Sequence, residues 1–130
     1  MGLQEAKSLS TPGSKEPAKE DEEEMTRADQ TNYRAMAARC NYLSLDRPDI
    51  QYASKEVCRW MQDPTWSDWL AIKRIARYLK GKPRLVYKYQ WQQAPGELIA
   101  HSDTNWAGCL KTRKSTSAGG IVYGGHLVRS

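Results

Sequence analysis

One carboxylate in the second half of the sequence stands where it could take part in metal chemistry. Asp103 ends an apolar run and precedes a tryptophan in HSDTNWAG (residues 101–108), and a basic, hydroxyl-rich stretch follows. Two-metal cleavage of a phosphodiester needs several carboxylates around cations roughly 3.5–4 Å apart, and Mg²⁺ normally draws on one or two carboxylates plus substrate phosphates. No Asp or Glu follows Asp103. The residues alone therefore favour a turn-forming role for Asp103 over a catalytic one.

Motifs for other kinds of catalysis are weaker. The two histidines, His101 and His126, have no flanking Ser or Cys motif of the kind that a catalytic triad uses. The Gly119-Gly120 and Gly124-Gly125 pairs do not form a dinucleotide-binding or P-loop pattern. They are better suited to hairpin bends than to holding phosphates.

Basic side chains gather in two places and point to nucleic acid. One group lies at helical spacing and is offset locally only by Asp68, and the other alternates with hydroxyl residues that can bond phosphates. A solvated basic surface is the alternative interpretation. Tryptophans could stack on bases, although core packing is their more frequent use; the three considered are Trp66, Trp69 and Trp91. The candidate nucleic-acid-binding residues are Lys73, Arg74, Arg77, Lys80, Lys82, Lys111, Arg113 and Lys114.

Charge is unevenly distributed along the chain. Residues 1–32 carry four Lys/Arg and eight Asp/Glu, a net charge of −4, whereas residues 33–130 carry sixteen and seven, a net charge of +9. Residues 1–30 also lack aromatic side chains, and such a segment predicts a disordered acidic arm or linker. The three cysteines form no CxxC pair, which argues against a zinc site or a disulfide framework and favours reduced thiols in an intracellular protein.

Apolar periodicity predicts three helices after this arm. The first covers residues 31–44, and the second begins at Pro48 and presents Ile50, Ala53 and Val57. The third begins after a capping box at Thr65 and ends at Gly81 before Pro83. We expect its apolar face to hold Trp69, Ile72, Ala76 and Leu79.

The period changes to two after the third helix. Leu85, Tyr87, Tyr89 and Trp91 alternate with more polar residues and predict a strand with one aromatic face. Residues 97–104 and 118–124 predict two more strands, and Gly124-Gly125 predicts a tight turn into a fourth. The fold class is therefore α+β: a disordered acidic arm, three helices and an antiparallel meander.

Several of these stretches together resemble a known family. The blocks DRPDI, KRIARYLKG and HSDTNWAG, with RKSTS close behind, are similar to the copia-type retrotransposon Pol polyprotein, over about residues 31–124. The similar stretch runs from the end of the reverse transcriptase into the start of the RNase H domain. One departure is Asn105, which stands where the family's second motif aspartate is usual.

The resemblance implies roles that the residues alone do not establish. It implies a thumb-like helical region that grips the primer–template duplex, followed by an incomplete RNase H-like sheet. It also implies that Asp103 descends from the first Mg²⁺-binding catalytic aspartate, which reverses the interpretation based on the residues alone. The paired polymerase aspartates and the later RNase H carboxylates are expected to lie outside residues 1–130, so Asp103 would bind Mg²⁺ only with partner carboxylates.

These considerations predict three parts: residues 1–30 as a disordered acidic arm, residues 31–83 as a thumb-like region, and residues 84–130 as a connection and truncated RNase H-like domain. The parent would copy RNA into DNA and degrade RNA in hybrids, whereas this chain alone is expected to be inactive and to bind no Mg²⁺ tightly. Expected partners are an RNA–DNA hybrid or duplex and the rest of the polyprotein, with no membrane and an intracellular location. The alternative is a degenerate or domesticated non-enzymatic module that binds nucleic acid or protein.

Overall fold

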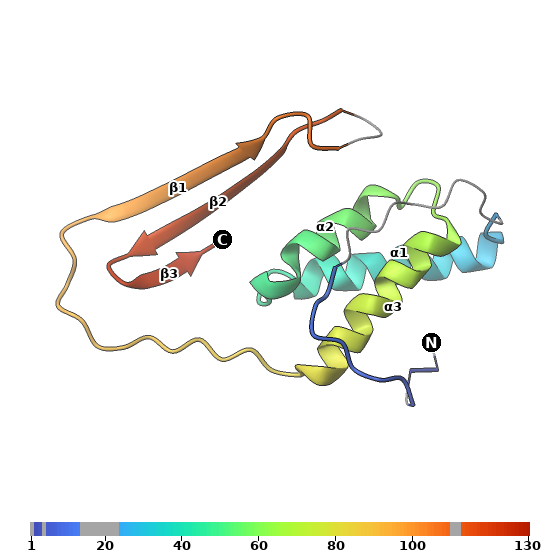
Figure 1. The fold of residues 1–130 in the computed structure, drawn as a ribbon, viewed down its shortest axis with the longest axis horizontal. Coiled ribbons are helices and arrows are strands. Elements are labelled where there is room, and N and C mark those ends of the chain that lie inside the picture. Colours follow the sequence, from blue (N-terminus) through green and yellow to red (C-terminus); the bar gives the residue numbers. More distant parts are fainter. Residues whose placement is uncertain (1, 4, 14–23, 110–112) are drawn as a thin grey trace. The chain divides into compact units, whose positions relative to one another are not determined.

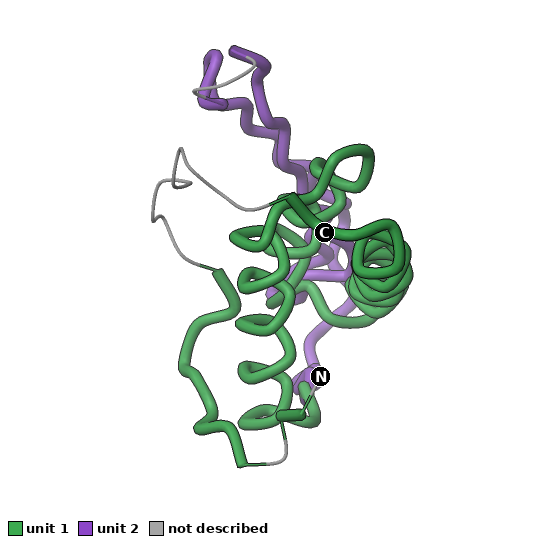
Figure 2. The backbone as a smooth tube through the Cα atoms, turned by 90° about the vertical axis from the view of Figure 1, so that its right-hand side faces the viewer, with its two compact units in different colours: residues 1–85 green, residues 86–130 purple. Residues whose placement is uncertain are grey.

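The computed structural model describes residues 2–3, 5–13, 24–109 and 113–130. Three α-helices, one short 3-10 helix and three strands lie in these residues. They form two compact units that divide between Leu85 and Val86 (Figure 2). The first unit is helical and the second contains an antiparallel sheet (Figure 1), so the predicted α+β class is confirmed.

Helix α1 spans Arg27–Leu43 and begins four residues earlier than predicted. Thr26 is its N-cap, and the Thr26 hydroxyl accepts a hydrogen bond from the Asp29 amide at 3.2 Å. Met25, one residue before this cap, is only 5% exposed and belongs to the core. The prediction of disorder is therefore wrong for residues 24–30, because a capped helix and a core contact begin there.

The 3-10 helix η1 (Pro48–Ile50) leads directly into α2 (Gln51–Arg59). Pro48 occupies the first turn, as predicted, where its missing amide hydrogen leaves no bond unmade. Ile50 and Val57 are buried, as predicted for the apolar face of this helix. Arg34 of α1 binds the chain that follows α2. It donates hydrogen bonds to the Met61 carbonyl at 2.7 Å and to the Gln62 carbonyl at 2.9 Å.

Helix α3 spans Trp66–Gly81 and begins at the predicted capping box. The Asp68 amide donates to the Thr65 hydroxyl at 3.4 Å, and the Thr65 amide donates to the Asp68 carboxylate at 2.9 Å. The helix ends at Gly81, as predicted from Gly81 and Pro83. Its buried residues are Ile72, Ile75 and Tyr78, so the predicted apolar face is wrong in its centre.

One hydrophobic core holds α1, α2 and α3 together. Tyr33 of α1 is completely buried, and its hydroxyl donates to the Val57 carbonyl at 2.6 Å. Burial raises the pKa of Tyr33 far above its ordinary value, because the phenolate would have to leave water. The buried hydrophobic residues are Met25, Tyr33, Ala37, Ile50, Ala53, Val57, Ile72, Ile75 and Tyr78.

The sheet consists of β1 (Leu98–Asn105), β2 (Thr116–Tyr123) and β3 (His126–Arg129), in that order and antiparallel throughout. These are the last three of the four predicted strands. Gly124, at φ +59°, makes the turn between β2 and β3, as the Gly-Gly pair predicted. This backbone conformation favours glycine, and a Cβ atom at Gly124 would lie 2.5 Å from the Gln92 side-chain oxygen, which would have to move.

The first predicted strand, residues 84–91, does not form. The backbone of these residues does not join the sheet, and the contacts with the β2–β3 hairpin involve the side chains of Tyr89 and His126. Tyr89 donates from its hydroxyl to the Leu127 carbonyl at 3.3 Å, and a His126 ring nitrogen lies 2.7 Å from the Gln90 carbonyl oxygen. Alternating side chains predict an extended backbone, but a strand also requires a neighbouring backbone for its hydrogen bonds. The prediction is wrong for this reason.

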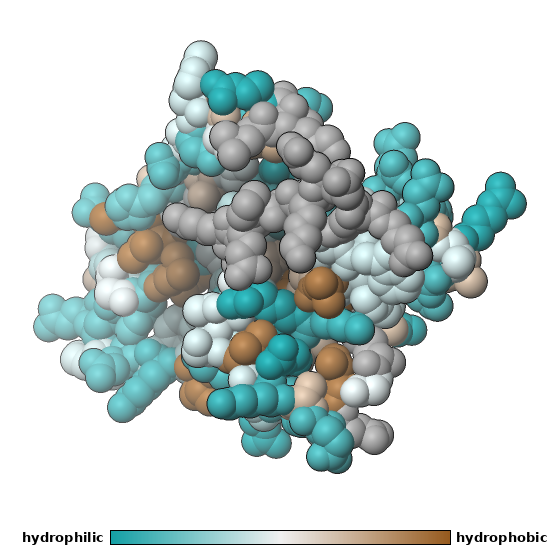
Figure 3. Space-filling model, turned by 45° about the vertical axis from the view of Figure 1, so that its right-hand side comes forward, coloured by the Kyte–Doolittle hydropathy of each residue, from teal (hydrophilic) through white to brown (hydrophobic). Residues whose placement is uncertain are grey.

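Large apolar side chains are also present on the surface, between hydrophilic ones (Figure 3). Such scattered exposure is ordinary for a folded chain. None of the helices in the described ranges is both long and apolar enough to cross a bilayer.

Candidate nucleic-acid interface

The basic residues of α3 lie in a long stretch without negative charge. Residues 69–96 contain seven Lys/Arg and no Asp or Glu. Arg74, Arg77 and Lys80 all hydrogen-bond to one short segment near the N-terminus, so they lie on the same side of the helix. These three cations of the predicted basic stripe therefore form one face of α3. This face does not lie directly opposite the buried one, since Arg74 and Arg77 are themselves half-buried.

The segment that meets this face consists of Leu3 and residues 5–13, which we call the N-terminal strap. Figure 1 shows it in dark blue beside α3. Besides accepting bonds from α3, it donates one from the Leu9 amide to the Arg77 carbonyl at 3.4 Å. The prediction of disorder is thus wrong for residues 5–13 as well. Residues 14–23 of the predicted arm lie outside the described residues.

The other two predicted residues near α3 differ in their surroundings. Lys73 is half-buried within the helix. Lys82 follows the last helical residue, and its ammonium group lies 5.3 Å from the centre of the Tyr78 ring, within the range of a cation–π contact. Its backbone carbonyl accepts a hydrogen bond from Arg47 at 3.0 Å. Lys82 therefore contributes contacts that stabilise the end of α3.

The second predicted basic cluster belongs to the other compact unit. Arg113 and Lys114 are exposed between β1 and β2, and Lys111 lies outside the described residues. The Arg113 amide donates to the Cys109 carbonyl at 2.8 Å, and Arg113 adopts φ +53°. The two exposed cations thus lie shortly before the start of β2.

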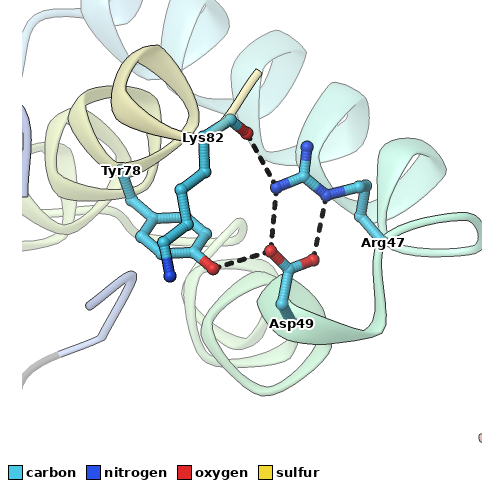
Figure 4. A network of polar contacts seen from close by, with 4 residues as sticks. All are labelled: Arg47, Asp49, Tyr78 and Lys82. Carbon is cyan, nitrogen blue, oxygen red and sulfur yellow. Dashed lines mark hydrogen bonds and ion pairs between the residues drawn. The ribbon is translucent and has the colours of Figure 1, made fainter. Parts of the chain in front are cut away.

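A polar network that no sequence signal identified joins the start of η1 to the end of α3 (Figure 4). Arg47 donates two hydrogen bonds to Asp49, from Nε at 2.9 Å and from Nη2 at 2.8 Å, and a third to the Lys82 carbonyl. The Tyr78 hydroxyl donates to the same carboxylate at 2.7 Å. Both ionic side chains are largely buried, with 8% of Arg47 and 18% of Asp49 exposed.

This network shifts the ionisation of its members. The hydrogen bonds from Arg47 hold the pKa of Asp49 below its usual value, and the bond from Tyr78 adds to the effect. The same carboxylate raises the pKa of Tyr78, because it accepts a hydrogen bond from the phenol and would repel a phenolate. Asp49 is therefore kept ionised in a site that a neutral carboxyl group would fit poorly.

A pH dependence of stability follows from the lowered pKa of Asp49. The unfolded aspartate titrates near pH ~3.9, so the stabilisation is fully present above that pH and is lost as the pH falls through the lower folded value. We expect the urea midpoint of the helical unit to fall between about pH 5 and pH 2, and to fall less in Asp49→Asn. Circular dichroism at a series of pH values measures this. Equal acid sensitivity in both proteins would contradict the assignment.

Asp103 lies late in β1, as predicted, where it pairs in register with Ala118. Its side chain is exposed, and its carboxylate accepts a hydrogen bond from the Thr104 amide at 2.9 Å. It does not form the turn that follows the strand. That role belongs to Asn105, whose side-chain oxygen accepts the Thr116 amide and closes the end of the two strands. The interpretation of Asp103 as a turn-forming residue is therefore wrong, because Asp103 lies within β1.

The surroundings of Asp103 do not fit a Mg²⁺ site on their own. The other carboxylate in residues 86–130 is Glu97, six residues earlier, or roughly 20 Å along an extended strand. Across residues 2–3, 5–13, 24–109 and 113–130, no three His, Cys, Asp or Glu side chains are grouped closely enough to hold a metal. Mg²⁺ generally needs more oxygen ligands than one carboxylate supplies.

The tryptophans considered as base-stacking candidates fall into two classes. Trp66 and Trp69 pack against the helical core, which agrees with the commoner use of tryptophan. Trp91 is 89% exposed, so the core interpretation is wrong for that residue. Trp106, which is not among the three stacking candidates, is 91% exposed and follows Asn105 in the sequence.

Comparison with known proteins identifies relatives over most of the chain. An uncharacterized mitochondrial protein of Arabidopsis thaliana is 37% identical over 91 residues, which cover 68% of this chain and 37% of that protein. Two retrovirus-related Pol polyproteins of Arabidopsis thaliana, from transposons RE2 and RE1, are 38% and 39% identical over 99 residues. Each match covers 75% of this chain, but only 7% and 6% of the respective polyproteins. No family model and no solved structure matches the chain.

The resemblance to retrotransposon Pol polyproteins is confirmed by these relatives. The identities lie at 37–39% and extend far beyond the short motifs that first indicated the family. The chain spans 37% or less of the length of each of these three proteins.

Proposed function

Because the chain is a relative of retrotransposon Pol polyproteins, we propose that it is a fragment of such a polyprotein and contributes binding of duplex nucleic acid. In this proposal residues 31–83 act as the thumb-like end of a reverse transcriptase. Residues 84–130 form the connection and the first strands of an RNase H-like domain. The order of the elements, three helices followed by an antiparallel sheet, supports this division.

The observation that carries the proposal is the basic face of α3. Arg74, Arg77 and Lys80 lie on one side of α3, within 28 residues that contain no acidic side chain. A row of cations on a helix suits the phosphate backbone of a duplex and carries little sequence information. We therefore expect affinity for RNA–DNA hybrids and other duplexes with little sequence preference.

Catalysis is not part of the proposed role of this chain. Asp103 has the strand position that the resemblance implies for a first catalytic aspartate, but its surroundings do not fit a Mg²⁺ site. We propose that it is catalytic by descent and idle in this chain. An RNA–DNA hybrid incubated with the chain and Mg²⁺ should stay intact, and cleavage that disappears in Asp103→Asn would contradict this part of the proposal.

The test of duplex binding compares two variants that lose the same charge. The first replaces Lys73, Arg77 and Lys80 by alanine, and the second replaces Arg27, Arg39 and Lys55, which belong to α1 and α2. Each lost phosphate contact should lower the slope of log affinity against log salt by about 0.9. We expect the α3 variant to bind a fluorescent RNA–DNA hybrid at least about tenfold more weakly at low salt, with a slope lower by about 2 to 3.

The control variant should keep the slope of the original chain. Fluorescence anisotropy across a salt series measures both quantities. If the chain does not bind the hybrid, or binds it without dependence on salt, the duplex-binding proposal fails and a protein-interaction module becomes the better description. If both variants bind the hybrid equally more weakly, the loss comes from the lower net charge of the chain. In that case α3 is not the binding site.

A further inference from the structure

The N-terminal strap uses the same side-chain atoms of α3 that a duplex would need. Arg74 donates from Nε to the Gly13 carbonyl at 3.0 Å and from Nη2 to the Thr11 hydroxyl at 3.0 Å. Arg77 donates from Nε to the Lys7 carbonyl at 2.7 Å. The strap therefore accepts hydrogen bonds from the guanidinium groups of both arginines of the basic face.

Lys80 continues this pattern toward the end of the helix. Its ammonium group lies 2.9 Å from the Ala6 carbonyl and 3.4 Å from the Leu3 carbonyl. Three successive cations of α3 thus bond to oxygen atoms of a segment more than sixty residues away in sequence. All but one of these acceptors are backbone carbonyls, so the contact depends on the path of the strap rather than on its side chains.

The strap carries no net charge of its own in residues 5–13, where Glu5 and Lys7 balance. It holds the cations through neutral acceptors, which make weaker hydrogen bonds than charged phosphate oxygens do. A phosphate backbone can therefore replace the strap on α3. Both cannot use the same N–H groups at once.

We propose that the N-terminal strap is an autoinhibitory segment that competes with duplex phosphates for the basic face of α3. This inference rests on the proposed function, because it concerns regulation of the same site. When only a fraction of molecules has the face uncovered, the apparent affinity falls by that fraction. Displacement or removal of the strap should then strengthen binding without any new contact to the duplex.

Gly81 offers a way to displace the strap without changing a charge. A Cβ atom at Gly81 would lie 2.7 Å from the Cβ atom of Ser8 and 3.3 Å from its hydroxyl oxygen. Gly81 has no left-handed backbone conformation that would itself oppose a side chain. In Gly81→Leu the strap must move, while Arg74, Arg77 and Lys80 keep their places on the helix.

The matched control is Gly96→Leu, because a Cβ atom at Gly96 would meet no atom within 4 Å. A third protein lacks residues 2–13 altogether. We expect Gly81→Leu and the truncated protein to bind the fluorescent RNA–DNA hybrid about three- to tenfold more tightly than the original chain. Their salt slopes should match that of the original chain, because the same cations contact phosphates once the duplex is bound. Gly96→Leu should bind as the original chain does.

Three outcomes decide the proposal, and circular dichroism first establishes that each variant keeps its helices. If the two altered proteins bind more tightly and the control does not, the strap is autoinhibitory. If the original chain binds the hybrid but the altered proteins bind equally or more weakly, the inference is overturned while duplex binding stands. If none of the four proteins binds the hybrid, the proposed function fails and the inference fails with it.

Discussion

Replacing Arg47 by alanine is expected to destabilise the helical unit by about 3–5 kcal/mol, enough to unfold a large share of the molecules. The substitution removes both hydrogen bonds to Asp49 and the bond to the Lys82 carbonyl. Asp49, with 18% of its side chain exposed, would then keep its negative charge without a counter-ion, although the Tyr78 hydroxyl would still donate to it. A buried charge without its counter-ion is the main source of the expected loss.

The connection to α3 makes this loss a property of the whole helical unit. Arg47 lies before η1, whereas Tyr78 and Lys82 lie at the far end of the chain segment that forms α3. The network therefore fastens elements that are more than thirty residues apart in sequence, as the bond from Arg47 to Lys82 illustrates. Its removal frees the end of α3 as well as the turn around Pro48.

Urea unfolding followed by the helical circular dichroism signal measures the effect. Arg59→Ala is the matched control, because Arg59 forms an ion pair with Glu56 at 3.3 Å near the surface, where such pairs contribute less than about 1 kcal/mol. Arg47→Lys should fall between the two, since an ammonium group keeps the charge but cannot make the two-pronged contact. A loss for Arg47→Ala no larger than that for Arg59→Ala would refute the role of the network.

The Arg47 network also illustrates why sequence reasoning found elements more readily than the contacts between them. Pro48 and the capping box at Thr65 act within a few residues, and both have their predicted roles in the structure. Gly124 likewise makes its turn through its own backbone conformation. The partners of Arg47 depend on how α3 returns past η1, and no local pattern contains that information.

The same distinction explains the errors at the two ends of the helical unit. The strap was predicted to be disordered because its composition gives it little apolar surface to bury. Its order comes instead from hydrogen bonds donated by α3, such as that of Arg77 to Lys7. Residues 84–91 show the reverse case, since their alternation predicts a strand but a ladder needs a partner that the sequence pattern does not supply.

The candidate site was predictable to a similar extent. The spacing of Arg77 and Lys80 identified a basic helix face, and the motif around Asp103 placed that residue late in a strand. Neither pattern could indicate that the cations of α3 are already bonded to the strap.

Helical periodicity predicts α3 correctly but misplaces its buried face. The predicted apolar face ran through Trp69, Ile72, Ala76 and Leu79. In the structure Ile72, Ile75 and Tyr78 are the buried residues, while Trp69 and Leu79 are only partly buried against the core. Successive steps of three turn the face slightly around the helix compared with steps of four. Ile75 thereby becomes a central residue of the core.

Ile75→Ala is accordingly expected to destabilise the helical unit by about 2–5 kcal/mol, whereas Leu70→Ala should change its stability by less than about 0.5 kcal/mol. Ile75 is 0% exposed and Leu70 is 62% exposed on the same helix, so the two variants lose three carbons each in opposite environments. The cavity left at Ile75 faces α1 and α2 side chains that cannot all move to fill it. Urea unfolding of both variants measures the difference. Equal stabilities, or a larger loss for Leu70→Ala, would show that α3 is turned about its axis relative to the arrangement described. The assignment of Arg74 and Arg77 to the face that meets the N-terminal strap would then be withdrawn as well.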